Sequence, residues 1–208
     1  MIYNYYPGCT LSTKAKELDV AARKCAEALG FPLVDLPEWQ CCGAVYPMAP
    51  DAIAERLSAV RALVAARENG GVLVTLCSAC HHVIKRVNDD MLNNEDIRNK
   101  VNNYLNLEVP YAGETKVLHY LEVLRDVVGF DNLKAKVVNP LKGRNIGAYY
   151  GCLFQLVNHN SHITYFHHIQ AIFVNVYIHQ NCLIPTFLLS YEVQLDLIIV
   201  IILLNHLL

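Results

Sequence analysis

The sequence predicts an α/β protein with a mostly parallel sheet flanked by helices. Short apolar runs with the character of buried strands alternate with longer segments that repeat apolar residues at helical spacing. Glycine and proline stand between them as turn signals. Strands that alternate with helices favour parallel pairing, because each crossover between parallel strands is made by a helix. At 208 residues the chain is long enough to bury a sizeable core.

The first strand is expected at residues 2–6, which are apolar and aromatic and end at a Pro-Gly turn. A helix follows, capped by Thr10 or Ser12, and we expect it to run to about Leu29, where a glycine stops it. The run FPLVDL at 31–36 predicts a second strand. The order strand, helix, strand is thus complete within the first 36 residues.

The same order then repeats. Pro50-Asp51 opens a helix whose apolar face ends before Gly70. Residues 72–76 (VLVTL) predict a buried strand, and 78–90 predict a helix. A further amphipathic segment at 118–128 is expected to be helical.

Five cysteines follow this pattern. Four of them fall just past the carboxyl ends of predicted strands, and the fifth begins a helix: Cys9, Cys41, Cys42 and Cys77, then Cys80. Open α/β sheets place their ligand crevices at that edge, so we expect these thiols to converge. The start of a helix favours negative charge, so we also expect it to lower the pKa of the thiols there.

Three kinds of chemistry are open to five thiols with this spacing. A zinc site closes with four ligands in compact pairs and would leave one thiol surplus. A thioredoxin-like pair at Cys77 and Cys80 would leave three unexplained. An iron–sulfur cluster uses several thiolates at once, and a long-range set suits a large one.

Composition limits the function classes. The formal net charge is -2, so no basic nucleic-acid surface is expected. The first residues lack a charged start followed by an apolar run, which argues against a secretory signal. Without export, cysteines are usually kept reduced. We therefore expect a cytoplasmic metal or redox protein.

The C-terminal part has an unusual composition. All 17 Lys and Arg lie between Lys14 and Arg144, and residues 155–208 hold six of the nine histidines. A membrane anchor is disfavoured because the run LDLIIVIILLNHLL is short and broken by polar residues, so no clear membrane span is expected. The histidines fit no zinc pattern. We favour a third interpretation, that this apolar tail was never selected as protein, for example after a frame shift.

The motifs YYPGC, CCG and CSAC, at these spacings, resemble the cysteine-rich CCG domain in the B subunit of heterodisulfide reductase. The resemblance covers residues 1–154. It implies a non-cubane 4Fe-4S cluster bound by the five cysteines. It also implies an oxidoreductase of methanogenesis that reduces the disulfide of coenzyme M and coenzyme B, or a similar disulfide. The implied partners are the iron–sulfur C subunit and the flavin-containing A subunit of a heterodisulfide reductase complex.

The family carries two such domains in tandem, and RNIGAYYGC at 144–152 is similar to the N-terminal motif. Cys152 is therefore a candidate first ligand of a second site. No second CCG or CxxC follows. We expect a first CCG domain at 1–143, the start of a second at 144–154, and a non-homologous tail at 155–208. On this interpretation the second half is missing or frame-disrupted.

Two other functions remain open. Related domains occur in flavin-linked complexes, where this chain would be a single-cluster electron-transfer subunit for glycolate, lactate or succinate oxidation. A zinc-binding interaction domain is the third candidate.

Several residues near the motifs have ordinary structural interpretations. Cys25 lies on an apolar helix face and is expected in the core. His81 and His82 are interpreted as exposed helix histidines, and His119 as a satisfied, half-buried one. Gly8, beside Cys9, is a candidate for close backbone approach to a bulky group.

Overall fold

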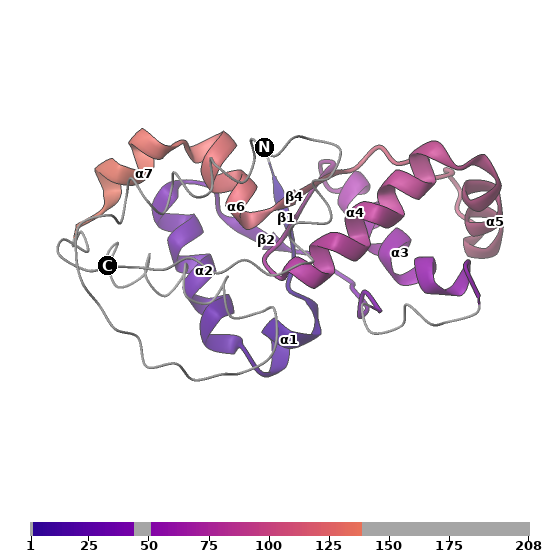
Figure 1. Cartoon of the computed structure of the whole chain (residues 1–208), viewed down its shortest axis with the longest axis horizontal. Coiled ribbons are helices and arrows are strands. Elements are labelled where there is room, and N and C mark those ends of the chain that lie inside the picture. Colours follow the sequence, from indigo (N-terminus) through magenta and orange to yellow (C-terminus); the bar gives the residue numbers. More distant parts are fainter. Residues whose placement is uncertain (1, 44–50, 139–208) are drawn as a thin grey trace.

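The described part of the chain forms a four-stranded parallel sheet with helices on both sides (Figure 1). The computed structural model describes residues 2–43 and 51–138. The strands are β1 (Tyr3–Tyr6), β2 (Leu33–Asp35), β3 (Val72–Thr75) and β4 (Lys116–His119). Their order is β2-β1-β3-β4, and every pair is parallel. The predicted α/β class with a parallel sheet is confirmed.

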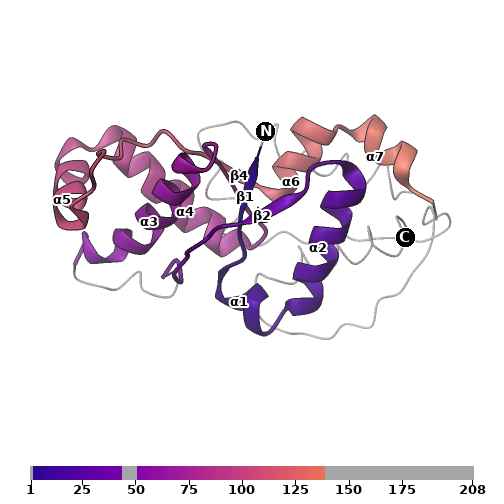
Figure 2. The same ribbon diagram turned by 180° about the vertical axis from the view of Figure 1, so that it is seen from behind.

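Two groups of helices enclose the sheet, and Figures 1 and 2 show them on opposite sides of it. One group contains α3 (Ala54–Glu68), α4 (Ser78–Asn93) and α5 (Glu95–Leu105). The other contains α1 (Gly8–Thr13), α2 (Lys16–Leu29), α6 (Tyr120–Val123), the π-helix η1 (Leu124–Val128) and α7 (Phe130–Lys136). Because both faces are covered, the inner strands β1 and β3 are buried along their whole length.

A buried asparagine fixes the inner strands relative to each other. Asn4, in β1, is fully buried. Its side-chain amide donates to the carbonyl oxygens of Asn69 at 3.0 Å and Val72 at 2.9 Å. Buried amides need such partners, so the contact joins β1 to the turn that leads into β3. The two strands are thereby held together near their amino-terminal ends.

The helix expected from Thr10 to about Leu29 is two helices, so that prediction was wrong in part. The backbone N–H groups of Lys14 and Ala15 both donate to the Thr10 carbonyl and close α1. Ala15 has non-helical angles and is the N-cap residue of α2. No proline or glycine marks this break in the sequence.

The expected helix at 118–128 was also wrong at its start. Leu118 and His119 are the last residues of β4, where they pair with Val74 and Thr75 of β3. The helical apolar spacing of this segment concealed a short strand, since four residues are too few to show their own period. Helices α5 and α7 were not predicted.

No helix among the described residues is both long and apolar enough to span a bilayer.

Candidate metal centre

The five predicted thiols lie at one edge of the sheet. Cys9 follows β1, Cys41 and Cys42 follow β2, Cys77 follows β3, and Cys80 is in the first turn of α4. All three strands are parallel, so their carboxyl ends share this edge. The convergence predicted from the sequence is therefore found in the structure. That the thiols are ligands stays a prediction.

The thiols meet through short contacts between their sulfur atoms. The Sγ atoms of Cys41 and Cys9 are 3.8 Å apart, and those of Cys42 and Cys80 are 3.4 Å apart. Cys80 also has a side-chain hydrogen bond with Cys77. Within residues 2–43 and 51–138, no three His, Cys, Asp or Glu side chains are grouped as for one metal ion. A site with several iron atoms spans a larger region than a single-ion site.

The five thiols differ in exposure. Cys42, Cys77 and Cys80 are 3%, 6% and 4% exposed, whereas Cys9 and Cys41 are exposed to solvent. The site therefore has a buried side formed around the CxxC motif and an open side formed by the other two thiols. Cys25 lies apart from them in the core face of α2, as expected.

Gly8 allows the backbone to pass close to the buried thiols. Its φ of +71° is in the left-handed region that favours glycine. A Cβ atom there would lie 2.8 Å from the Cys80 sulfur and 3.3 Å from Cε1 of Tyr6. A side chain at Gly8 would therefore force the Cys80 sulfur to shift. That the backbone at Gly8 approaches a bulky bound group stays a prediction.

The thiol pKa values contradict the sequence-based expectation. For Cys80, hydrogen bonds with the Cys42 and Cys77 thiols, followed by burial, raise the pKa well above its usual range. For Cys41, the Gly43 N–H bond lowers the pKa, but burial and the neighbouring Cys9 thiol raise it by more. The lowering of the thiol pKa expected from the helix N-terminus is outweighed, because several thiolates in one place repel each other. Such a site favours cationic partners.

The aromatic side chain of Tyr6, in β1, lies beside the thiols. The Tyr6 hydroxyl donates to the Gln40 carbonyl, and the Tyr6 and Trp39 rings are edge to face with centroids 5.5 Å apart. Burial, and then negative charge on four of the cysteines, raises the pKa of Tyr6. Tyr6 is therefore a neutral side chain beside the thiols.

His119, at the end of β4, is fully buried and uses both ring nitrogens. Nδ1 accepts from the Leu121 N–H, so the proton lies on Nε2, which donates to the Leu76 carbonyl at 3.2 Å. The His119 N–H donates to the Glu122 carboxylate at 2.7 Å. The expectation of a satisfied histidine is confirmed, but the expected half-buried position was wrong, because His119 is fully buried. Its bond to Leu76 holds the peptide just before Cys77.

His82 was expected to be exposed, and it is half-buried. His81, next to Cys80, was also expected to be exposed, and that prediction was wrong. It is 2% exposed, and its Nδ1 is 3.2 Å from the Thr75 hydroxyl. Burial, followed by the positive charges nearby, lowers its pKa well below the usual value. The buried Glu122 carboxylate lies 3.8 Å from its Nε2.

Sequence reasoning missed Glu122 altogether. Its carboxylate is 5% exposed, and Lys85, in α4, lies 3.9 Å from it. The signal was the spacing of His119 and Glu122, three residues apart at a helix start, which is the pattern of a capping box. Strand β4 was not predicted from the sequence, so the helix start was placed too early and this signal was overlooked.

Cys152, the segment 144–154 and the tail 155–208 lie outside the described residues. The predicted second site and the domain boundaries beyond residue 138 therefore stay predictions.

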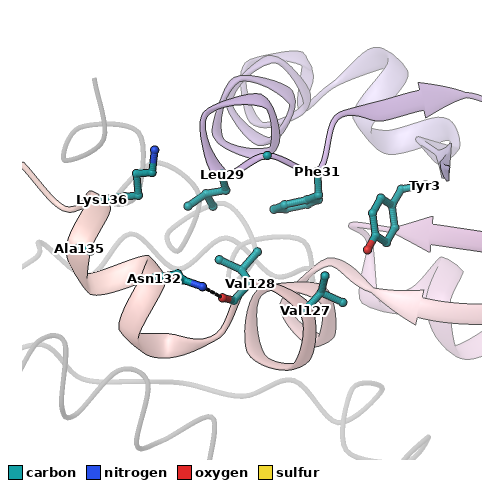
Figure 3. A pocket seen from close by; sticks show the side chains of 9 residues that line it. Tyr3, Leu29, Phe31, Val127, Val128, Asn132, Ala135 and Lys136 are labelled. Atoms are coloured by element: carbon teal, nitrogen blue, oxygen red, sulfur yellow. Dashed lines mark hydrogen bonds between the residues drawn. The ribbon is translucent and has the colours of Figure 1, made fainter. Parts of the chain in front are cut away.

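The cavity in Figure 3 is separate from the thiols. Its volume is about 420 Å³, and Tyr3, Phe31, Val128 and Asn132 are among its lining residues. Tyr3 begins β1, so this cavity lies at the amino-terminal edge of the sheet, opposite the cysteines. It holds none of the predicted site residues.

A family model matches the N-terminal part of the chain. Residues 3–85 match the cysteine-rich domain family CCG. The chain therefore resembles this family over part of its length. The matched segment contains all five converging cysteines and ends within α4.

This chain is similar to curated relatives over 150 to 154 residues. It is 31% identical over 154 residues to a protein of Archaeoglobus profundus named as similar to the B subunit of heterodisulfide reductase, covering 73% of this chain and 52% of the relative. It is 29% identical over 151 residues to the 8-methylmenaquinol:fumarate reductase membrane anchor subunit of Wolinella succinogenes, covering 72% of this chain and 52% of the relative. The predicted resemblance to the B subunit is confirmed.

A third relative is the B subunit of the ferredoxin/F(420)H(2)-dependent CoB-CoM heterodisulfide reductase of Methanosarcina acetivorans. The identity is 26% over 150 residues, covering 71% of this chain and 49% of the relative. The chain thus spans about half the length of the curated relatives it matches.

Proposed function

We propose that the five thiols hold an iron–sulfur cluster of the non-cubane 4Fe-4S type and that the chain is the B-type subunit of a disulfide reductase. The observation that carries this proposal is the convergence of Cys9, Cys41, Cys42, Cys77 and Cys80 at one sheet edge. Thiolates are the usual ligands of iron–sulfur clusters, and five are more than one zinc ion uses.

The residues fit such a group in two ways. The pKa values of the Cys41 and Cys80 thiols are raised by their neighbours, so thiolates accumulate there only beside a cation, and iron supplies that charge. Gly8 leaves room next to Cys80 that a side chain would fill. When bound, the cluster supplies one-electron transfer to a sulfur–sulfur bond.

The protein's own residues give this site an anchored side and an accessible side. The buried thiols of Cys42, Cys77 and Cys80 anchor the cluster away from water. Tyr6 lies beside the thiols, and its ring packs edge to face against Trp39. Cys9 and Cys41 face solvent, so a small-molecule disulfide approaches from their side.

The proposed substrate is the disulfide of coenzyme M and coenzyme B, or a similar disulfide, which is reduced to two thiols. The proposed partners are an iron–sulfur C subunit and a flavin-containing A subunit. Two relatives named for the B subunit of heterodisulfide reductase support this choice. The same proposal places the chain in the cytoplasm and, with these coenzymes, in methanogenesis.

A second candidate is a single-cluster electron-transfer subunit of a flavin-linked complex. The likeness to the fumarate reductase membrane anchor subunit of Wolinella succinogenes favours it. In that case the cluster would accept and pass on electrons without reacting with a disulfide.

One experiment separates the two candidates. The full chain is loaded with iron and sulfide under anaerobic conditions and reduced by dithionite, after which excess reductant is removed. Adding the mixed disulfide of coenzyme M and coenzyme B should reoxidise the cluster and release thiols. A reduced cluster that the disulfide leaves unchanged, but that a quinone analogue reoxidises, would refute disulfide reduction and support electron transfer.

A further inference from the structure

Two of the five thiols form a pair that solvent can reach. Cys9 and Cys41 are both exposed, and their sulfur atoms are 3.8 Å apart. A disulfide requires about 2.05 Å, so the atoms need to approach by about 1.8 Å. Cys41 lies in the segment after β2 that forms neither helix nor strand, which allows a movement of this size.

The other possible pairs are shielded or strained. Cys42 and Cys80 are closer, at 3.4 Å, but are 3% and 4% exposed. Cys77, which completes the CxxC pair, is 6% exposed. A disulfide between the adjacent residues Cys41 and Cys42 would strain the geometry of the bond. Access controls thiol–disulfide exchange, so exposure, rather than distance, selects the reactive pair.

We propose that Cys9 and Cys41 are a dithiol that reduces small-molecule disulfides when no cluster is bound, and that they become an intramolecular disulfide. One protein thiolate attacks a disulfide R–S–S–R, forms a mixed disulfide and expels one thiolate. The second protein thiol attacks the protein sulfur of that bond and expels the other. The small disulfide gains two electrons, and the two protons of the protein thiols leave with the two released thiols.

The reaction would control cluster assembly. Cysteines bind iron as thiolates, so the oxidised pair withdraws two of the five ligands. Assembly would then require a reductant as well as iron and sulfide. This consequence rests on the proposed function, whereas the pairing itself does not.

The test uses the full chain produced without iron, fully reduced and then freed of reductant. It is titrated with oxidised glutathione under anaerobic conditions and digested for peptide mapping. The first disulfide should join Cys9 to Cys41, with two glutathione thiols released for each bond formed. A first disulfide at Cys77–Cys80, Cys42–Cys80 or Cys41–Cys42 would overturn the proposal.

Variants sharpen the assignment. Cys41→Ser should retain glutathione on Cys9 as a stable mixed disulfide, because the second attack is lost. Cys80→Ser, which removes a buried thiol, should form the Cys9–Cys41 bond like the parent chain. If Cys80→Ser abolishes the bond while its circular dichroism stays native, the buried thiols take part and the proposal fails.

A cluster-loading arm separates this inference from the proposed function. Reduced and glutathione-oxidised protein are each given iron and sulfide. We expect loading of the reduced sample only. If neither sample binds a cluster but the bond still maps to Cys9 and Cys41, the proposed function fails and the pairing stands. If both load equally, the control of assembly is refuted.

Discussion

Replacing Gly8 by alanine perturbs the site through a single methyl group. Gly8 has a φ of +71°, and the new Cβ would lie 2.8 Å from the Cys80 sulfur. Gly30 is the matched control, because its φ is +84° and no atom would lie within 4 Å of its Cβ. Both substitutions thus carry the backbone cost, and only Gly8→Ala carries the contact.

The difference between the two variants can be worked out from these contacts. The left-handed conformation costs alanine about 1–2 kcal/mol, so Gly30→Ala should lower the free energy of unfolding by that amount. Overpacking against Cys80 and Tyr6 adds about 1–3 kcal/mol for Gly8→Ala. The Cys80 sulfur must also shift, so this variant should bind much less iron than the Gly30 control.

Urea unfolding of the reduced, metal-free chain, followed by circular dichroism, measures the stability difference. Iron per chain after anaerobic reconstitution measures the effect on the site. Equal stability and equal iron content in the two variants would refute the inference that Gly8 is required for close packing against Cys80.

Three further predictions concern Cys42, His119 and Cys25. Cys42→Ser should lose cluster occupancy while Cys25→Ala keeps it, as measured by iron analysis; equal retention would contradict the ligand set. His119→Ala should lower the free energy of unfolding by about 1–3 kcal/mol, because it leaves buried backbone groups without partners. His119→Asn, which can still cap the Leu121 N–H, should recover part of this loss in urea unfolding. Burial raises the pKa of Cys25 to about 11, so in the folded chain it should resist iodoacetamide at pH 8.5 and react only above about pH 10; rapid labelling at pH 8.5 would contradict its burial.

The sequence predicted the thiol site well because two strong signals coincide there. Apolar runs mark the ends of β1, β2 and β3, and a cysteine follows each of them. Parallel strands bring those ends together whatever the details of the helices, so errors such as the break at Ala15 did not affect the prediction.

The buried polar groups were not predictable in the same way. His81 follows the CxxC motif in a helix, and its burial depends on β4 and the helix start that packs against α4. The four residues of β4 have no distinct period of their own in the sequence, so the position of Glu122 was also lost. The thiol pKa values depend on distances between sulfur atoms, which no spacing in the sequence contains.

The central claim is that these five cysteines hold one iron–sulfur cluster. Its most direct test is anaerobic production of the full chain, with iron, sulfide and zinc analysis and paramagnetic resonance of the reduced and oxidised protein. We expect about four iron and four sulfide per chain and a resonance signal that Cys42→Ser abolishes. A folded product that contains zinc and no iron or sulfide would contradict it.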